Sequence, residues 1–121
     1  PAGGKGDIKI GERVYINSCC VLYSGNGISI GDDVLISANC TIAPVNHEYT
    51  NRSKKISCQG HASSKGGVII EDNVWIGSNT VILDGSHICS GTVIAAGSLV
   101  REKCESNRVF GGNPLREIKK I

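Results

Sequence analysis

The sequence predicts an all-β protein built as a parallel β-helix, in which three short strands make one turn of a triangular prism. The prediction rests on a six-residue period that runs without a break from Ile70 to Glu105. A period of six fits neither an α-helix at 3.6 residues nor a single strand at 2, but it fits a coil of three strands. The aliphatic residues that open these hexads are Ile70, Ile76, Ile82, Ile88, Ile94 and Val100.

Two other registers of the hexads support this fold over a β-sandwich with coincidental spacing. Residues at the fourth position take positive φ at least cost, with Lys103 as the exception, so we expect a corner every six residues. They are Asn73, Asn79, Gly85, Gly91 and Gly97. Residues at the fifth position are small or β-branched, namely Val74, Thr80, Ser86, Thr92, Ser98 and Cys104. We expect the first and fifth residues to point inward and to stack on residues eighteen positions away.

The pattern predicts one domain, residues 1–121, of about four coils. Coils are expected over residues 10–42 and 68–105, because hexads also begin at Ile10, Ile16, Ile30 and Ile36. Two extra residues within 23–29 and a larger insertion interrupt the count. Both fall in the third hexad of their coil, so they should leave the prism along the same edge. The larger insertion, residues 43–67, is polar and rich in Ser and Lys, which indicates a long loop.

The C-terminal segment, residues 106–121, is expected to depart from the repeat after Glu105. Phe110 is expected to close the open end of the prism. Asn113 followed by Pro114 fits a helix N-cap with Pro at the first helical position, which predicts a short C-terminal helix.

Composition narrows the class of protein. The net charge of +2 does not favour nucleic acid as a partner, and no apolar run approaches the length of a membrane span. Six cysteines occur without a CxxC pair. Cys20, Cys40 and Cys104 occupy the small interior position of their hexads, so we interpret them as reduced core residues and expect a cytoplasmic protein.

Among the three histidines, His47 is the candidate for chemistry. It stands where the regular coil gives way to the loop, and a histidine held at a rigid edge can act as a general base near neutral pH. A surface histidine without a role is the alternative. We expect His61, which lies deeper in the loop, and His87, which occupies an outward position of its hexad, to be surface histidines without a functional role.

Two further features suggest binding. Trp75, the only tryptophan, is predicted to point outward, which suggests a contact with a ligand or with a neighbouring subunit. Arg116 and Lys119 lie in a basic terminal segment, and Arg101 lies on the last coil. Such residues can bind phosphate groups, although a solvated basic tail is the simpler interpretation.

Three motifs in order along the chain, residues 70–78, 94–100 and 112–116, resemble the hexapeptide-repeat O-acetyltransferases. That family includes galactoside and maltose acetyltransferases, capsule and O-antigen acetyltransferases, and enzymes that modify chloramphenicol and streptogramins. The resemblance implies a left-handed β-helix and a homotrimer with active sites between subunits. It also implies acetyl-CoA as co-substrate, a sugar or surface-polysaccharide precursor as acceptor, and no required metal.

The resemblance also implies roles for single residues. His47 would deprotonate the acceptor hydroxyl as it attacks the thioester in a ternary complex. Asn17 and Trp75 would contact substrate. Contacts to coenzyme A would come from Ser78, Ala96, Arg101, Arg116 and Lys119. Independently of the resemblance, Ser78 and Ala96 are eighteen residues apart, so the hexad count stacks one above the other.

Four alternatives remain open at this point. The acceptor could be a xenobiotic such as chloramphenicol or a streptogramin. Transfer could pass through an acyl-cysteine on Cys58. The chain could be a metal enzyme like the carbonic anhydrases built on the same prism, although histidine spacings of 14 and 26 do not favour it. Finally, it could be a non-catalytic structural solenoid.

Overall fold

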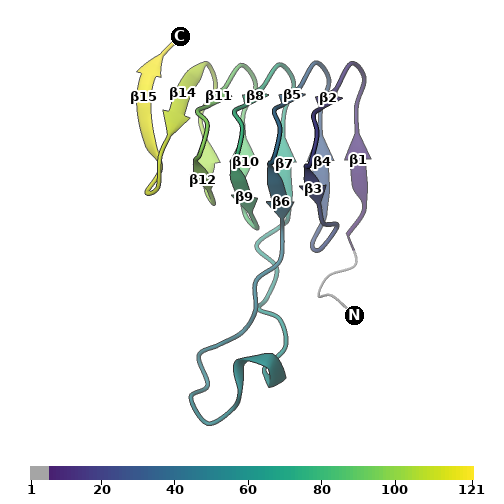
Figure 1. Ribbon diagram of the computed structural model, residues 1–121, viewed down its shortest axis with the longest axis vertical. Helices are drawn as coiled ribbons and strands as arrows, with labels where there is room; N and C mark the ends of the chain where they lie inside the picture. Colours follow the sequence, from purple (N-terminus) through teal and green to yellow (C-terminus); the bar gives the residue numbers. More distant parts are fainter. Residues whose placement is uncertain (1–5) are drawn as a thin grey trace.

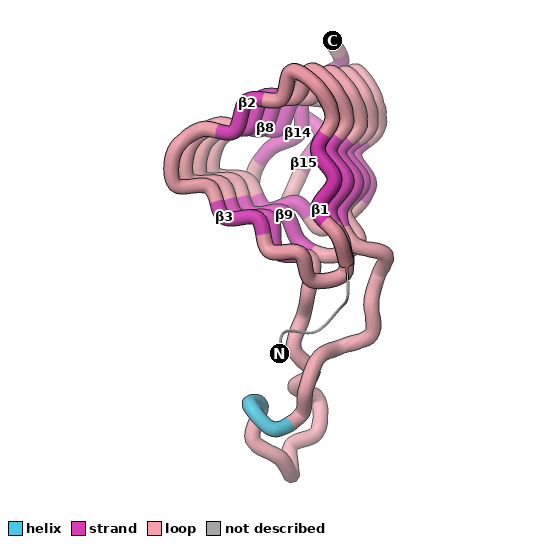
Figure 2. Tube along the Cα trace, turned by 90° about the vertical axis from the view of Figure 1, so that its right-hand side faces the viewer, coloured by secondary structure: helices cyan, strands magenta, loops and turns pink. Residues whose placement is uncertain are grey.

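The computed structural model describes residues 6–121, and these wind into a left-handed parallel β-helix with three flat faces (Figures 1 and 2). The first face contains β1 (Ile8–Ile10), β4 (Ile28–Ile30), β7 (Val68–Ile70), β10 (His87–Ile88) and β13 (Lys103–Cys104). The second contains β2 (Tyr15–Ile16), β5 (Leu35–Ile36), β8 (Trp75–Ile76), β11 (Val93–Ile94), β14 (Arg108–Gly111) and β15 (Arg116–Lys120). The third contains β3 (Val21–Leu22), β6 (Thr41–Ala43), β9 (Val81–Leu83) and β12 (Leu99–Val100).

The interior of the prism is a stack of aliphatic side chains. All six leading residues from Ile70 to Val100 are at most 1% exposed, and each packs against its equivalents in neighbouring coils. The hydroxyl groups at the fifth position are also buried, and each donates a hydrogen bond to a backbone carbonyl, which for Thr80, Ser86 and Ser98 lies three residues earlier and for Thr92 is that of Glu105. Thr80 Oγ1 bonds to the Gly77 carbonyl at 2.7 Å, and Ser86 Oγ bonds to that of Leu83 at 2.6 Å. The narrow core therefore accepts small polar residues without leaving a donor unpaired.

The predicted corners are confirmed. Asn73, Asn79, Gly85, Gly91 and Gly97 all have positive φ, between 57° and 88°. In the first two coils the same position holds Arg13, Cys19, Gly25, Asp33 and Asn39, again with positive φ. Side chains other than Gly and Asn are thus accepted at some corners, which weakens the signal in the N-terminal part of the sequence.

Variation in coil length is confined to one edge, the edge between the third face and the first. Ile8 pairs with Ile28, twenty residues on, and Ile28 pairs with Val68, forty residues on. The regular spacing of eighteen returns from Ile69 to His87. Insertions of two and of twenty-two residues therefore leave along the same edge, and strand register on the other two faces is undisturbed. Figure 1 shows the chain between β6 and β7 leaving the prism, with the short 3₁₀ turn η1 (Ile56–Cys58) far from the coils.

The expected end of the repeat at Glu105 is wrong. His87 pairs with Lys103, only sixteen residues on, so the corner after Val100 is two residues short. Cys104 consequently pairs with Ile88 and fills a leading position instead of a fifth position, while remaining fully buried. One more hexad follows: Asn107 turns its corner with φ of 57°.

The expected C-terminal helix is also wrong. Residues 116–120 form β15, which runs antiparallel to β14. Gly112 has φ of 97°, so the chain reverses direction after β14 instead of starting a helix. Strand β15 pairs with the free edge of β14, and Leu115 packs against the core near Phe110, which is itself partly buried there.

Two expectations from composition can be compared with the structure. All six cysteines are free thiols, and Cys40 and Cys104 are buried in the core, while Cys20 is partly buried against it. Over residues 6–121 the structure has no helix long and apolar enough to cross a membrane.

Candidate functional site

His47 lies at the base of the loop between β6 and β7, where two stretches of chain cross. Residues 46–48 run antiparallel to residues 60–62: the Ala62 amide donates to the Asn46 carbonyl at 2.8 Å, and the Glu48 amide donates to the Gly60 carbonyl at 2.9 Å. This crossing places His61 opposite His47, with ring centroids 4.8 Å apart. His61 therefore has a neighbour that the sequence did not reveal.

Asp84 ties the returning end of this loop to the coils. Its side chain is only 2% exposed, yet it accepts hydrogen bonds from the Lys65 and Gly67 amides, both at 2.8 Å, and from Asn26 Nδ2 at 3.2 Å. Gly67 has no room for a side chain, because a Cβ there would lie 2.5 Å from the Gly27 carbonyl oxygen. Asp84 was not among the residues predicted from the sequence. Its signal is a carboxylate directly before a corner glycine on the edge where the loop departs.

A cavity of about 540 Å³ lies between the loop base and the coils. His47, Tyr49, Lys65, Asp84 and Arg101 line it, together with Asn46, Glu48, Ala62 and Leu83. Arg101, which the resemblance assigned to coenzyme A together with Ser78 and Ala96, thus lies with His47 and apart from those two residues. Two cations and two carboxylates surround the cavity, so it suits a polar, hydroxyl-rich ligand.

Glu48 and Gln59 order the loop from within. The Glu48 carboxylate accepts hydrogen bonds from the Thr50 hydroxyl at 2.8 Å and from the Tyr49 and Thr50 amides, and these bonds lower the pKa of Glu48, that of the Thr50 hydroxyl most. The Gln59 side chain accepts from the Asn51 amide and donates to the carbonyls of Asn51 and Lys54. Hydrogen bonds from polar side chains therefore hold the backbone of the loop in place, whereas stacking of aliphatic side chains holds the coils together.

Trp75, Ser78 and Ala96 come together elsewhere, at the edge between the second and third faces. They line a groove of about 380 Å³ whose other walls are largely apolar: Ser37, Gly77, Val93, Ile94, Ala95 and Val109. Trp75 Nε1 donates to Ser37 Oγ at 3.1 Å, which fixes the indole ring over the groove. Ser37 was not singled out in the sequence, and its signal is only its place one coil before Gly77.

The stacking predicted for Ser78 and Ala96 follows from the register. Trp75 pairs with Val93 and Ile76 with Ile94, so positions eighteen residues apart are neighbours along this edge. The Gly97 amide donates to the Ser78 carbonyl at 2.8 Å. The backbone beneath the groove is closely packed, and only glycine fits at position 77, because a Cβ there would lie 2.5 Å from the Ala96 nitrogen.

The remaining predicted residues lie near this groove but do not line it. Asn17 follows β2 at the same edge as Ser37, and its Nδ2 donates to the Ile36 carbonyl at 3.2 Å. Lys119 lies on β15 opposite Val109, which does line the groove, and Arg116 lies opposite Gly111. Both basic side chains are exposed.

The residues predicted to form one site are therefore divided between two edges of the prism. His47 and Arg101 line one cavity, Trp75, Ser78 and Ala96 line the other, and the two sets of lining residues share no member. Within one chain the candidate base and the candidate acyl groove do not form a single pocket.

Comparison with known proteins gives matches to two family models. Residues 67–102 match "Bacterial transferase hexapeptide (six repeats)", and residues 7–44 match "Hexapeptide repeat of succinyl-transferase". The matched ranges correspond to the regular coils and omit the loop.

Three similar proteins illustrate the match. Galactoside O-acetyltransferase of Escherichia coli (strain K12) is 35% identical, covering 95% of this chain and 55% of its own length. A putative lipopolysaccharide biosynthesis O-acetyl transferase of the same strain is 32% identical, covering 98% and 63%. The chain thus spans somewhat more than half the length of these relatives. The structure of a Vibrio cholerae hexapeptide-repeat acetyltransferase complexed with acetyl coenzyme A superimposes with a TM-score of 0.84 at 30% identity, covering 98% and 69%.

Proposed function

Because the chain belongs to the hexapeptide-repeat acetyltransferase family, we propose that it transfers an acetyl group from acetyl-CoA to a hydroxyl of a sugar or surface-polysaccharide precursor. One observation carries the proposal. The three residues expected beside the acyl donor, Trp75, Ser78 and Ala96, line a single groove although they come from two different coils.

The groove has the properties needed to hold an acyl thioester. Its walls are mostly apolar, and the small residues at the corner, Gly77, Ala95 and Ala96, allow a thin extended chain to approach the backbone. Backbone N–H groups near Ser78 are candidates for stabilising the oxyanion that forms on the thioester carbonyl, a contribution of about 3 kcal/mol per donor in other enzymes. Arg116 and Lys119, on β15, would bind the phosphates at the far end of the coenzyme.

His47 would act as the general base. The acceptor hydroxyl loses its proton to the imidazole as its oxygen attacks the thioester carbon, and coenzyme A leaves as the thiol. Lys65 and Arg101 on the cavity wall can hold a polar acceptor by donating hydrogen bonds to its oxygen atoms. Both substrates are bound at once, so proximity supplies part of the rate enhancement.

A homotrimer would complete this site. His47 and the Trp75 groove lie on different edges of one prism, so neither edge alone offers both the base and the acyl donor. In a cyclic trimer the loop of one subunit can face the groove of the next, and the arrangement repeats three times. The names of two relatives refer to galactosides and to lipopolysaccharide biosynthesis, which is why we place a sugar hydroxyl in the loop cavity.

The test is acetyl-CoA consumption by the purified chain against a panel of sugars, nucleotide sugars, chloramphenicol and a streptogramin. We expect turnover with a sugar acceptor. His47→Ala should then lose about 10² to 10⁴ in turnover, the usual loss for a general base, while assembly and coenzyme A binding stay intact. His61→Ala is the matched control, because His61 is the ring beside His47, and it should lose far less.

The alternatives predict other results. A trimer that binds no coenzyme A would indicate a structural solenoid, and turnover with chloramphenicol or a streptogramin alone would indicate a xenobiotic enzyme. Ping-pong kinetics that disappear in Cys58→Ser would indicate an acyl-cysteine. If His47→Ala retains most of its activity, the mechanism is wrong, and His61 becomes the next candidate.

A further inference from the structure

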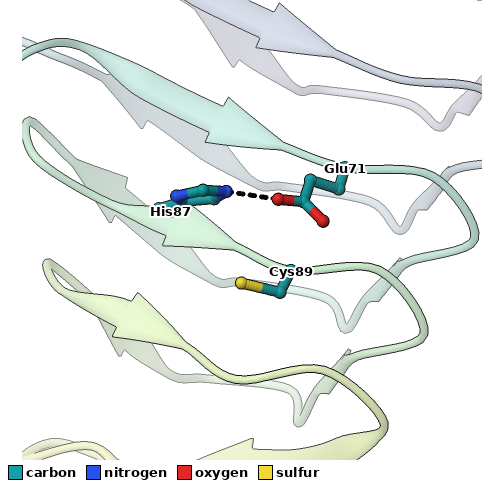
Figure 3. A group of neighbouring side chains, drawn as sticks. All are labelled: Glu71, His87 and Cys89. Carbon is teal, nitrogen blue, oxygen red and sulfur yellow. Dashed lines mark hydrogen bonds and ion pairs between the residues drawn. The ribbon is translucent and has the colours of Figure 1, made fainter.

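A second cluster of reactive side chains lies on the remaining edge, between the first and second faces, and takes no part in the proposed acetyl transfer. Glu71 directly follows β7, and Cys89 directly follows β10. Since Ile70 pairs with Ile88, Glu71 and Cys89 are neighbours in adjacent coils. Figure 3 shows their side chains and that of His87 directed toward one another.

The three side chains are already close enough to share a ligand. One donor atom from each, a carboxylate oxygen, an imidazole nitrogen and a thiol sulfur, lies within 4.8 Å of the others. His87 Nε2 lies 2.5 Å from Glu71 Oε2. The other carboxylate oxygen, Oε1, accepts a hydrogen bond from the Ser90 amide at 3.0 Å, which holds Glu71 in place. The contact between His87 and Glu71 was not predicted from the sequence, which favoured a surface histidine without a role at this position.

We propose that Glu71, His87 and Cys89 bind a divalent transition-metal ion, with Zn²⁺ as the best fit. Zinc binds thiolate, imidazole and carboxylate ligands at about 2.0–2.3 Å, which places the ligands of a tetrahedral ion roughly 3.5 Å apart. The present donors, which lie within 4.8 Å of one another, would need side-chain rotations to reach that spacing. A set of one sulfur, one nitrogen and one oxygen atom does not suit Mg²⁺ or Ca²⁺, which take oxygen ligands.

A catalytic thiol is the competing interpretation of Cys, His and Glu side chains in contact. It is disfavoured because Cys89 is only 7% exposed and His87 Nε2 is hydrogen-bonded to Glu71 Oε2, not to the thiol. A nucleophilic cysteine needs a partly exposed, electropositive environment. A bound cation would supply the missing positive charge, convert the thiol to a thiolate and release its proton to solvent.

The surroundings leave a place for a fourth ligand. Glu71 and Ser90 line a cavity of about 380 Å³ on the outside of the first face, together with Ser29, Gly31, Ile69, Ile70 and Asp72. Cys89 is 7% exposed, whereas the side chains of His87 and Glu71 are 34% and 39% exposed, so a water molecule can approach the cluster from the side of these two residues. Because β7 and β10 belong to successive coils, the ion would tie two turns of the helix together at an edge that has no inserted loop.

Cobalt(II) in place of zinc tests the site directly on the whole chain, without reference to acetyl transfer. We expect one Co²⁺ per chain, with the visible bands of a tetrahedral ion and a thiolate-to-cobalt charge-transfer band. Cys89→Ser should abolish the charge-transfer band. His87→Gln and Glu71→Gln should weaken affinity by more than the roughly 10- to 100-fold lost with outer-shell partners of metal ligands.

Two control variants separate this site from other donors. Cys58→Ser removes an exposed thiol, and His61→Gln removes the ring beside His47, so both should bind Co²⁺ as the unmodified chain does. The proposal is overturned if the chain binds no Co²⁺, if the charge-transfer band persists in Cys89→Ser, or if it is lost in Cys58→Ser.

A thermal melt keeps the proposal testable if Cys89→Ser does not fold. Zn²⁺ should raise the melting temperature of the unmodified chain and of Cys58→Ser, because it binds only the folded state. His87→Gln changes a half-exposed side chain and should fold, yet Zn²⁺ should leave its melting temperature unchanged. An equal Zn²⁺ effect in the unmodified chain and in His87→Gln would overturn the proposal.

Discussion

The coils and the loop between β6 and β7 are held together by different interactions. In the coils, successive turns repeat a buried aliphatic stack, and side-chain hydrogen bonds such as those of the buried hydroxyls and of Trp75 to Ser37 add to it. In the loop nearly every residue from 47 to 66 is exposed or half-exposed, and Glu48, Gln59 and Asp84 hold the backbone through polar contacts. Stability is thus concentrated in the repeat, and the cavity with His47 lies where the repeat is interrupted.

The three edges of the prism also differ in whether they accept changes in coil length. Every change in coil length occurs between the third and first faces, so the other two edges keep their stacked columns. One of those columns carries the Trp75 groove, and the other carries Glu71 and Cys89. An insertion at one edge can therefore change without disturbing the register on which the groove depends.

The largest expected effect is on the free energy of unfolding, which a substitution in the coils should lower much more than one in the loop. Ile82→Ala removes a fully buried side chain from the stack and should cost about 2–5 kcal/mol of unfolding free energy. Ile56→Ala, in η1, changes a side chain that is 60% exposed and should stay within about 0.5 kcal/mol. Urea unfolding of both variants checks this. Equal losses would mean that the loop belongs to the core.

Asp84 connects the coils to the returning end of the loop, and its replacement should loosen the loop while leaving the coils unchanged. Asp84→Ala leaves the Lys65 and Gly67 amides without their acceptor, a cost of about 1–3 kcal/mol for a buried unpaired group. Hydrogen exchange should accelerate at residues 65–67, and turnover should fall because the His47 cavity shares this wall. Faster exchange throughout the coils would contradict a local role.

Arg116 and Lys119 test the donor groove without touching the loop. If both bind phosphates, Arg116→Ala with Lys119→Ala should raise the apparent constant for acetyl-CoA by up to about thirtyfold, since two exposed ion pairs of at most about 1 kcal/mol each contribute at most about 2 kcal/mol together. The constant for the acceptor should not change. High salt should have the same effect on the unmodified chain. An unchanged acetyl-CoA constant would return these residues to a solvated basic tail.

The smallest effect should be an acid-dependent loosening of the loop. The pKa of Glu48 is lowered in the folded chain, so its hydrogen bonds are fully present above the ordinary value of 4.5 and are lost as pH falls through the lower folded value. Amide exchange at residues 49 and 50, corrected for its intrinsic pH dependence, should lose protection only in that acidic range. In Glu48→Gln the protection of these amides should no longer vary with pH.

The sequence was sufficient for the repeat because its signal is local and redundant. Six leading aliphatics, and five Asn or Gly residues at the following corners, agree with one another, and the structure places all of them as expected. Stacking of Ser78 on Ala96 followed from counting alone. The C-terminal segment carried no such repetition, and a local rule for Asn113-Pro114 predicted a helix.

What only the tertiary structure decided is which distant residues meet. The free edge of β14 recruits residues 116–120 as a strand, because pairing there satisfies backbone groups that a short helix would have left exposed on this end of the prism. The crossing of the loop brings His61 to His47, and the coil register brings His87 and Cys89 to Glu71. A six-residue period fixes the face on which a side chain lies, but a contact across an insertion of twenty-two residues depends on the path of the loop, which no local pattern encodes.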